Sequence, residues 1–582
     1  MKSNLMQKEK RILNREDLLA DIMLLVVAFF LLFWAIGERS LWSSEGRWAE
    51  IVREMLTSGD FFHPTIGGKP YFDKPLLTYW IIAAFSAVTG RLDELIVRLP
   101  SALAGIVTLV CTMYLGRRLW SRQVGMLAAG LLLTSYGLLM YSRVGSAETE
   151  NLAVIMLAVT WYWTRREKSG FVTFLVFYLI IFVGSHMKGL TAFVVPVLVL
   201  LPDLLRERRW RLIFWPSHLL ALGIGIIVYL APFVYATLTQ PEGYHQSGLH
   251  LVFQENILRY FKPFDHQGPI YQYLISVPLL TMPWTPILVG ALITSIISWK
   301  KYNSHARWLL QAILLIFIFF TLSGSRRNYY ILPILPFCML LMAVFLVEVS
   351  QEIVGNHRDR SLCIQLEILV VAAILEAILG PLVIWLLMKK VNWQLPSNLG
   401  WSFFIIGTSA LLAGTIAHKV CGRMALNIQL QTIWALIIMS GVLLGGFFVW
   451  QYNILESYRT ERPFALRIKA AIESLPHERV AFWRRTEDKV LFYTAWDPPV
   501  TILTDENSLQ TFLESDQPGL IISKGRYISE TVASMLPSLP TYKETKYVWE
   551  SHEKHQEKLR AWLINPNVSK FAIENKEKNR AN

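Results

Sequence analysis

Apolar residues along this chain gather into long runs that short polar segments separate. Fourteen such runs occur, and most have the length of about 17 to 25 residues with which a helix crosses a bilayer. They lie near 21–37, 76–89, 98–116, 124–141, 150–164, 171–186, 188–204, 212–235, 270–298, 307–323, 329–348, 363–388, 401–418 and 428–450. Because a transmembrane barrel would show short alternating segments instead, the pattern predicts a polytopic α-helical membrane protein.

The basic residues between the runs indicate which runs cross the bilayer, because clusters of Lys and Arg favour the cytoplasmic side. If all fourteen runs crossed, the cluster at 117–122 and every later one would lie outside. If the run at 76–89, which is short for a span, does not cross, all the clusters lie in the cytoplasm. We therefore expect about 13 transmembrane helices, a cytoplasmic N-terminus and an extracytoplasmic C-terminus.

This threading makes residues 38–97 one long outer loop on the membrane surface, with amphipathic helices near 46–56 and 76–89. The apolar residues of the first helix are Trp48, Ile51, Met55 and Leu56. Their helical spacing against the charged positions predicts one dry face and one wet face. The simplest interpretation of Glu50 and its charged neighbours Arg53 and Glu54 is therefore that they form the wet face.

The composition changes after residue 450. Residues 455–582 are polar, and their short strand-like runs are RVAFW, VLFYT, PVTIL and GLIIS. Helix-like runs lie between them, namely RPFALRIKAAIESL, DENSLQTFLES and RYISETVASML. The alternation predicts a small α/β domain outside the membrane. The expected organisation is thus a cytoplasmic N-terminus at 1–20, a transmembrane domain at 21–454 that includes the loop 38–97, and this domain at 455–582.

Composition agrees with the membrane class and excludes others. Of 582 residues, 53% are hydrophobic and only 17% are charged, which is too apolar for a soluble protein of this size. The net charge of +13 does not indicate nucleic-acid binding, because the basic residues sit in short clusters between apolar runs. The four cysteines show no CxxC spacing and predict neither a disulfide framework nor a cysteine metal site. The first run lacks a cleavage pattern, so we expect it to be retained as a helix.

Ionisable side chains gather at the predicted outer ends of the helices, although such groups are costly at membrane depth. They are Glu45, Arg47, Asp73, Lys74, Arg143, Glu148, Glu150, Lys188, Glu255, Arg259, His266, Arg326 and Arg327. Cations of this kind suit a phosphate-bearing head group, and a carboxylate among them could act as a general base. Two simpler interpretations stay open: Arg326 and Arg327 as an interfacial anchor, and Lys188 as a snorkelling lysine.

The stretch SEGRWAEIVREMLTSGDFFHPTIGGKPYFDKPLLTYW, residues 44–80, resembles the first outer loop of GT-C glycosyltransferases of the ArnT and protein O-mannosyltransferase type. Further segments resemble the same family in register: RLPSALAG, YSRVGSAETENLAV, MKGLTAFVVPVLVLLP, FQENILRYF and LSGSRRNYYILPILP. The resemblance covers roughly residues 20–350. It implies a GT-C fold, with 21–454 as the catalytic domain, and a transferase that takes a sugar from a polyprenyl-phosphate donor.

The resemblance also implies roles for individual residues. The expected phosphate- and donor-binding residues are Lys74, Arg259, Tyr71, Tyr330 and Arg47. The expected catalytic carboxylates are Glu45 and Glu148. No cofactor is implied with certainty; a divalent metal is conceivable but disfavoured, and we assign no metal ligands.

Three departures from the family pattern bear on mechanism. Ser44 stands where the family carries an aspartate, Asp73 stands where some relatives carry a metal-contacting glutamate, and Asn256 replaces a histidine. A serine does not accept a proton at neutral pH. Either Glu45 or Glu148 is then the base, or the acceptor is a group such as phosphate that is already ionised, or activity is weakened.

We therefore expect a hexosyl- or pentosyltransferase of a bacterial-type inner membrane, with a polyprenyl-phosphate sugar as donor. The acceptor would be an extracytoplasmic lipid or envelope glycan, lipid A-like. Two alternatives stay open: protein O-mannosyltransferase-like activity on a polypeptide hydroxyl, and a non-catalytic carrier of lipid-linked sugars. The expected partners are the donor, a lipid or protein acceptor and the membrane, with no nucleic acid.

Overall fold

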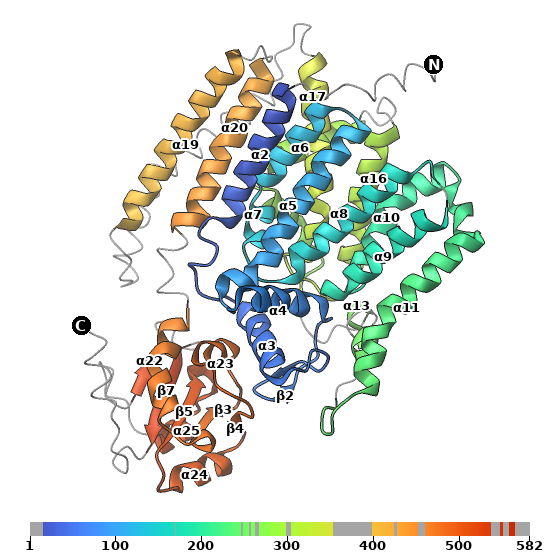
Figure 1. Ribbon diagram of the computed structural model, residues 1–582. Coiled ribbons are helices and arrows are strands. Elements are labelled where there is room, and N and C mark those ends of the chain that lie inside the picture. Colours follow the sequence, from blue (N-terminus) through green and yellow to red (C-terminus); the bar gives the residue numbers. More distant parts are fainter. Residues whose placement is uncertain are drawn as a thin grey trace. The chain divides into compact units, whose positions relative to one another are not determined.

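The computed structural model describes residues 15–168, 170–245, 248–254, 258–261, 267–297, 304–352, 398–423, 428–451, 460–536, 548–550 and 558–564 (Figure 1). The chain divides into two compact units, which we describe separately. The helical unit comprises Met1–Ile36, Arg98–Ala231 and Val252–Tyr452. The composite unit comprises Gly37–Val97, Pro232–Leu251 and Asn453–Asn582. The composite unit thus draws on three stretches that are distant in the sequence.

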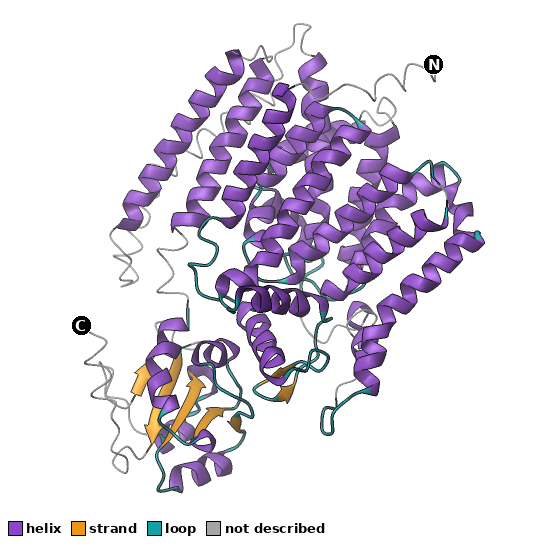
Figure 2. Ribbon diagram, in the orientation of Figure 1, coloured by secondary structure: helices purple, strands orange, loops and turns teal. Residues whose placement is uncertain are grey.

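The helical unit is built almost wholly from helices (Figure 2). They are α2 (Arg15–Phe33), α5 (Glu94–Leu119), α6 (Arg122–Leu133), α7 (Tyr136–Ser142), α8 (Ala147–Arg165), α9 (Phe171–Lys188), α10 (Thr191–Arg206), η2 (Arg209–Phe214), α11 (Pro216–Leu238), α13 (Arg259–Phe261), α14 (Gln272–Thr281), α15 (Thr285–Ile297), α16 (Ser304–Leu322), η4 (Leu332–Ile334), α17 (Leu335–Glu352), α19 (Asn398–Arg423), α20 (Ile428–Gly446) and η5 (Phe447–Gln451). α5 and α11 each extend a few residues into the composite unit. Every apolar run assigned to this unit is helical in the described part of the chain; the run at 363–388 lies outside the described residues.

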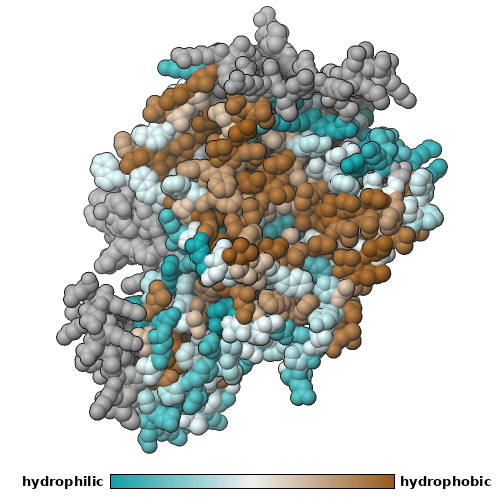
Figure 3. All heavy atoms as spheres, in the orientation of Figure 1, coloured by the Kyte–Doolittle hydropathy of each residue, from teal (hydrophilic) through white to brown (hydrophobic). Residues whose placement is uncertain are grey.

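Five of the described helices are long and apolar enough to cross a membrane. Two further apolar runs form bent pairs, α6 with α7 at 61° and α14 with α15 at 114°, which makes seven if each pair is one span. Apolar side chains cover much of the helical surface (Figure 3), as expected for helices that face lipid. The count of 13 stays a prediction.

Charged side chains fix the ends of the helices in this unit. The guanidinium of Arg143 donates to the carbonyl oxygens of Leu31 at 2.7 Å and Trp34 at 2.8 Å, at the C-terminal end of α2. Carbonyls at a helix end lack intrahelical partners, so a buried cation stabilises them. Arg143 therefore has a structural role in this fold.

In the composite unit, the predicted outer loop forms two helices and a hairpin. α3 (Glu45–Ser58) and α4 (Leu77–Thr89) each end at a glycine with positive φ, Gly59 at +75° and Gly90 at +70°. The strands β1 (Thr65–Ile66) and β2 (Lys69–Pro70) pair antiparallel between them, and α12 (Gly248–Phe253) follows α11. With 13 residues, α4 is only about 20 Å long, which agrees with the interpretation that it does not span.

The C-terminal part of the composite unit holds a five-stranded sheet in the order β4-β3-β5-β7-β6. Its strands are β3 (Val480–Trp483), β4 (Thr501–Leu503), β5 (Gly519–Lys524), β6 (Val548–Glu550) and β7 (Leu559–Ile564). β3 pairs parallel with β4 and β5, whereas β7 pairs antiparallel with β5 and β6. The helices are α22 (Arg462–Glu473), η7 (His477–Arg479), α23 (Asp488–Thr494), α24 (Glu506–Glu514), η8 (Gly525–Tyr527) and α25 (Glu530–Met535).

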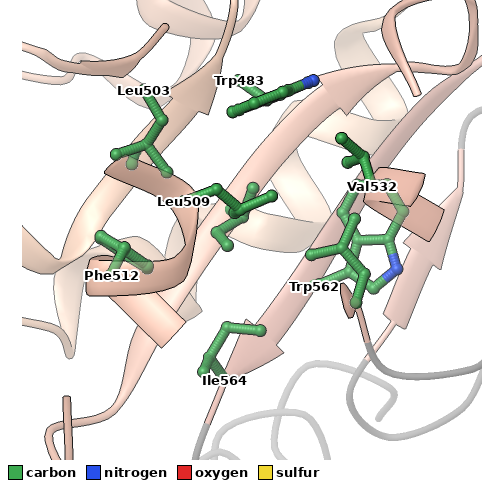
Figure 4. Close-up of a cluster of buried hydrophobic side chains, with 10 residues drawn as sticks. Trp483, Leu503, Leu509, Phe512, Val532, Trp562 and Ile564 are labelled. Atoms are coloured by element: carbon green, nitrogen blue, oxygen red, sulfur yellow. The ribbon is translucent and has the colours of Figure 1, made fainter. Parts of the chain in front are cut away.

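The sequence predicts most of these elements correctly, but it misses β6 and β7 and assigns one run wrongly. VLFYT, predicted as a strand, lies in helix α23. Its buried residues are Val490, Leu491 and Thr494, which fall on one helical face, and so short an apolar run does not distinguish helix from strand by periodicity. A core of buried side chains packs against the sheet, and it includes Trp483, Leu509 and Trp562 (Figure 4).

Candidate active site

The first candidate carboxylate, Glu45, begins α3 and is fully buried. It accepts a hydrogen bond from the backbone N–H of Trp42 at 2.7 Å, and each carboxylate oxygen lies 3.4 Å from Arg39 Nη2. A carboxylate at this position also complements the positive end of the helix dipole. The structure therefore gives Glu45 a role in closing the turn before α3, and its catalytic role stays a prediction.

Three side chains of the outer loop, those of Arg47, Tyr71 and Lys74, meet around the carboxylate of Asp73. We call these four residues the cation cluster. Arg47 Nη1 donates to the Tyr71 hydroxyl at 2.7 Å and lies 3.3 Å from Asp73 Oδ2. Lys74 Nζ lies 3.5 Å from the same oxygen and donates to the Asp73 carbonyl at 2.8 Å. All three charged side chains stay 23–28% exposed. The cluster thus presents two cations, one carboxylate and one phenol at a partly open surface.

The electrostatics of the cation cluster favour an anion. Burial opposes the charge of Arg47, but Asp73 and Tyr71 outweigh that effect and raise its pKa, so the guanidinium stays ionised. Burial and the neighbouring Asp73 raise the pKa of Tyr71, so its hydroxyl keeps its proton and can donate. Two positive charges exceed the single negative charge of Asp73, and such an excess attracts a phosphate group.

The helical unit contains a second cluster around the other candidate carboxylate, Glu148. Lys188, the last residue of α9, forms an ion pair with Glu148 in the first turn of α8. The Lys188 ammonium also lies 5.6 Å and 5.0 Å from the ring centroids of Tyr329 and Tyr330, within the range of a cation–π contact. Both charged side chains are at most 15% exposed. We call these four residues the Glu148–Lys188 cluster.

Comparisons with known proteins find similar sequences and similar structures for this chain. Residues 73–235 match the family described as dolichyl-phosphate-mannose-protein mannosyltransferase. The chain is also 30% identical over 344 residues to the undecaprenyl phosphate-alpha-4-amino-4-deoxy-L-arabinose arabinosyl transferase of Aeromonas salmonicida, and 30% identical over 338 residues to that of Pseudomonas paraeruginosa. These alignments cover 57% and 56% of this chain, and 60% and 59% of the relatives. The chain therefore spans about three fifths of the length of the relatives that it matches.

Solved structures show the fold. ArnT from Cupriavidus metallidurans bound to undecaprenyl phosphate superposes with a TM-score of 0.71 at 18% identity, covering 93% of this chain and 97% of that one. Its apo state gives 0.69 at 19% identity over the same shares. The chain has an ArnT-like GT-C fold. The predicted family resemblance and the polytopic helical fold are confirmed at this level.

Several candidate residues lie within the stretch that matches the family model. Asp73, Lys74, Glu148 and Lys188 lie within the matched stretch 73–235. Among the described residues, no three His, Cys, Asp or Glu side chains gather as a metal site would require. The described side chains do not fit a metal site, so we derive no step through one.

Arg259 and Arg326 are two further charged residues that the sequence places at the outer helix ends. Arg259 begins α13, but its side chain lies outside the described part of the structure, as do Glu255, Asn256 and His266. The guanidinium of Arg326 donates to the carbonyls of Gly268 at 2.7 Å and Thr321 at 3.0 Å. Its bonds hold backbone together, and this favours a structural role for Arg326.

Lys188 is the residue of the Glu148–Lys188 cluster that the predicted site omits. It was recognised in GSHMKGL as a charge at an outer helix end, but a snorkelling role left it out of the predicted site. In the structure its ammonium is bound to Glu148 and two tyrosine rings. The sequence does carry a signal for such a partner. Lys188 lies between two apolar runs, and an isolated cation at membrane depth requires a partner.

The wet-face interpretation of α3 is wrong. Glu50 and Glu54 are 0% and 2% exposed, although both were assigned to solvent. Arg53 donates to both oxygens of Glu50, at 2.8 Å and 2.9 Å, and to the carbonyl of Trp496 at 2.6 Å. The charged face of this ArnT-like helix is therefore packed inside the composite unit, because partners from distant stretches satisfy its charges.

Glu54 completes this packing. Its carboxylate accepts from the backbone N–H of Gly67 and the hydroxyl of Thr65, both at 2.5 Å, and from the N–H of Gly68 at 3.3 Å. Thr65 lies in β1, and Gly67 and Gly68 form the turn that joins β1 to β2. A buried carboxylate with several donors is stable where an unpaired one is not, so Glu54 ties the hairpin to α3.

Burial of Glu50 predicts a pH dependence of stability. Burial outweighs the hydrogen bonds from Arg53 and raises the pKa of Glu50 from 4.5 to about 8. Between these values the folded state binds a proton that the unfolded state has lost, so the free energy of unfolding falls as pH rises from 4.5 through 8, by at most about 1.4 kcal/mol per pH unit. Denaturant melts of the detergent-solubilised protein measure the slope. Glu50→Gln is expected to flatten it, and an unchanged slope in that variant would contradict this assignment.

Proposed function

We propose that this protein is a membrane glycosyltransferase that moves a hexosyl or pentosyl group from a polyprenyl-phosphate donor to an extracytoplasmic lipid or envelope glycan. The observation that carries the proposal is the cation cluster, which offers Arg47, Lys74 and the Tyr71 hydroxyl to a phosphate. The relatives named as undecaprenyl phosphate-dependent arabinosyl transferases, and the ArnT structure bound to undecaprenyl phosphate, support the same donor class.

The chemistry follows from the charges that develop in transfer. An acceptor oxygen attacks the anomeric carbon, the bond from that carbon to the phosphate oxygen breaks, and the electron pair leaves with the polyprenyl phosphate. Negative charge grows on the leaving phosphate, where preformed cations lower the barrier. Arg47 and Lys74 are proposed to bind this phosphate, with the Tyr71 hydroxyl beside them. Arg259 and Tyr330 are proposed as donor-binding residues on the family resemblance alone.

The fate of the acceptor proton depends on the acceptor. A hydroxyl requires a base, and Glu148 is the stronger candidate because it is partly exposed, whereas Glu45 is fully buried against Arg39. Lys188 would hold the Glu148 carboxylate in place through their ion pair. A phosphate acceptor is already ionised and requires no base, and Ser44 in place of the family aspartate favours this class of acceptor.

A second function, protein O-mannosyltransferase-like transfer to a polypeptide hydroxyl, is favoured by the family description that matches residues 73–235. We rank it below the first because the curated relatives and the fold agree on the ArnT type. For either function we propose a bacterial-type inner-membrane location, with 13 helices, a cytoplasmic N-terminus and the domain at 455–582 outside.

The test is transfer by the purified protein in proteoliposomes. Undecaprenyl-phosphate arabinose or mannose derivatives with a labelled sugar are supplied with lipid A, a phosphate-free glycolipid or a serine-rich peptide as acceptor. We expect label on lipid A, and Glu148→Gln is expected to spare transfer to phosphate but to lower transfer to hydroxyls by about 10²–10⁴-fold. Label on the peptide alone would establish the second function, and donor binding without transfer would establish the carrier alternative.

A further inference from the structure

We infer that the segment 487–500, which contains α23, is a positioning element for the cation cluster: it sets where Arg47 and Lys74 stand relative to each other. This inference rests on the proposed function, since it concerns the same donor site. It assigns to the C-terminal stretch of the composite unit a part in donor binding, although none of the candidate site residues predicted from the sequence lies in that stretch.

The first contact lies at the start of α3. A Cβ added at Gly46 would stand 3.2 Å and 3.3 Å from the backbone N and Cα of Lys489, and 2.2 Å from its Cγ. The first turn of α3 therefore lies directly on the backbone of α23, and Gly46 is the residue that permits this approach. Arg47 is the next residue, so its backbone position is set by that contact.

Charge reinforces the contact at the same place. Burial raises the pKa of the Asp488 carboxyl, while the positive charges of Lys489 and Arg47 lower it. The Arg47 guanidinium and the Asp488 carboxylate therefore attract each other. Lys489 is itself fixed by an ion pair with Glu461 at 2.5 Å. The head of α23 thus holds both the backbone and the charge of the first turn of α3.

The second contact lies at the hairpin that leads into the rest of the cluster. The backbone N–H of Val500 donates to the Gly67 carbonyl at 3.0 Å. A Cβ at Gly68 would meet Pro498 at 3.0 Å, so the turn between β1 and β2 rests on 498–500. Tyr71, Asp73 and Lys74 follow β2 within a few residues, and their position depends on this turn.

Tyr493 and Arg53 join these two contacts into one support. The Tyr493 hydroxyl accepts from the N–H of Leu41 at 2.7 Å and donates to Glu94 at 3.0 Å. Arg53, in the middle of α3, donates to the Trp496 carbonyl. One short segment therefore holds the loop before α3, the body of α3 and the hairpin after it. The positions of Arg47 on α3 and of Lys74 after β2 therefore both depend on this segment. A displacement of about 1 Å in such a supporting segment costs up to 10²-fold in rate.

The experiment compares Gly46→Ala with the full-length wild-type protein. We expect the Kd for undecaprenyl phosphate and the KM for the donor to rise about tenfold to a hundredfold, with the acceptor KM and the melting temperature unchanged. Lys489→Ala in the Gly46→Ala background removes the γ carbon that lies 2.2 Å from the added Cβ and is expected to recover most of the loss. The matched control is Gly223→Ala, a helical glycine with open space around it, which should leave all four quantities unchanged.

A second variant tests the charge without adding volume. Asp488→Asn is expected to weaken undecaprenyl phosphate binding severalfold, because the attraction that holds Arg47 is lost, while the exposed Asp516→Asn has no effect. Normal donor Kd and KM in both Gly46→Ala and Asp488→Asn would overturn the inference, as would a defect in Gly46→Ala that Lys489→Ala does not relieve. Because undecaprenyl phosphate binding is measured directly, absence of sugar transfer by the wild type would refute the proposed function and leave the positioning result readable.

Discussion

Replacing Lys74 by alanine is expected to lower kcat/KM for the polyprenyl-phosphate donor by about 10²–10³-fold. Lys74 provides one of the two cations beside Asp73, at 3.5 Å from its Oδ2. Without it, Asp73 balances Arg47 and the cluster loses its net positive charge. One preformed donor aimed at developing negative charge contributes an effect of this size. Initial rates of sugar transfer in proteoliposomes, at varied donor concentration, measure it.

Lys69→Ala is the matched control for this variant. Lys69 lies five residues earlier in the same loop, in β2, and its side chain is exposed. Its loss removes one positive charge from the loop without touching the cation cluster, so it should alter kcat/KM less than twofold under a salt concentration that screens distant charges. Equal losses in the two variants would mean that only the overall charge of the loop matters.

Above pH 8, where Glu50 is ionised, replacing Arg53 by alanine is expected to destabilise the composite unit by about 3–5 kcal/mol. Glu50 is fully buried and Arg53 is 13% exposed, so the variant leaves a buried carboxylate without its cation. The Trp496 carbonyl also loses a donor. Hydrogen–deuterium exchange of the peptides that cover α3 and α23 locates the effect, and denaturant melts give its size.

Arg91→Ala provides the comparison for Arg53. Arg91 also pairs with an acid, Asp93 at 3.3 Å, but the two side chains are 57% and 35% exposed. An exposed pair of this kind contributes about 0–1 kcal/mol. An equally small loss of stability in Arg53→Ala and Arg91→Ala would mean that the charged face of α3 is solvated and not buried in the composite unit.

The helices could be predicted because each apolar run carries its own signal. A run such as 171–186 or 307–323 is too long and too apolar to be anything but a buried or spanning helix, and α9 and α16 cover them. The hairpin turn and the breaks within bent pairs could not be predicted this way. They depend on which distant backbone groups supply partners.

The candidate site also combines features that are local in the sequence with features that depend on distant residues. Tyr71 and Lys74 are near neighbours in the sequence, and the motif predicts them as donor-binding residues together with Arg47. The structure brings these three side chains together around Asp73, and their donor-binding role stays a prediction. The partner of Glu148 is 40 residues away in the chain, and nothing local links it to Lys188. The charged face of α3 misled because amphipathic spacing identifies a polar side without saying what covers it.

The three-stretch build of the composite unit also constrains how the protein is made. The N–H of Leu41 and the hydroxyl of Tyr493 that binds it are 452 residues apart, and Arg53 and Trp496 are 443 apart. At the ordinary pace of ribosomes, about 5–20 residues per second, the earlier member of each pair waits roughly 20 to 90 s for the later one. Throughout that interval the nascent chain already has Arg47 and Lys74 but lacks the segment 487–500 that packs against their loop. The cation cluster is therefore expected to reach its final arrangement only late in biosynthesis, and a chain released early is expected to lack the proposed donor binding.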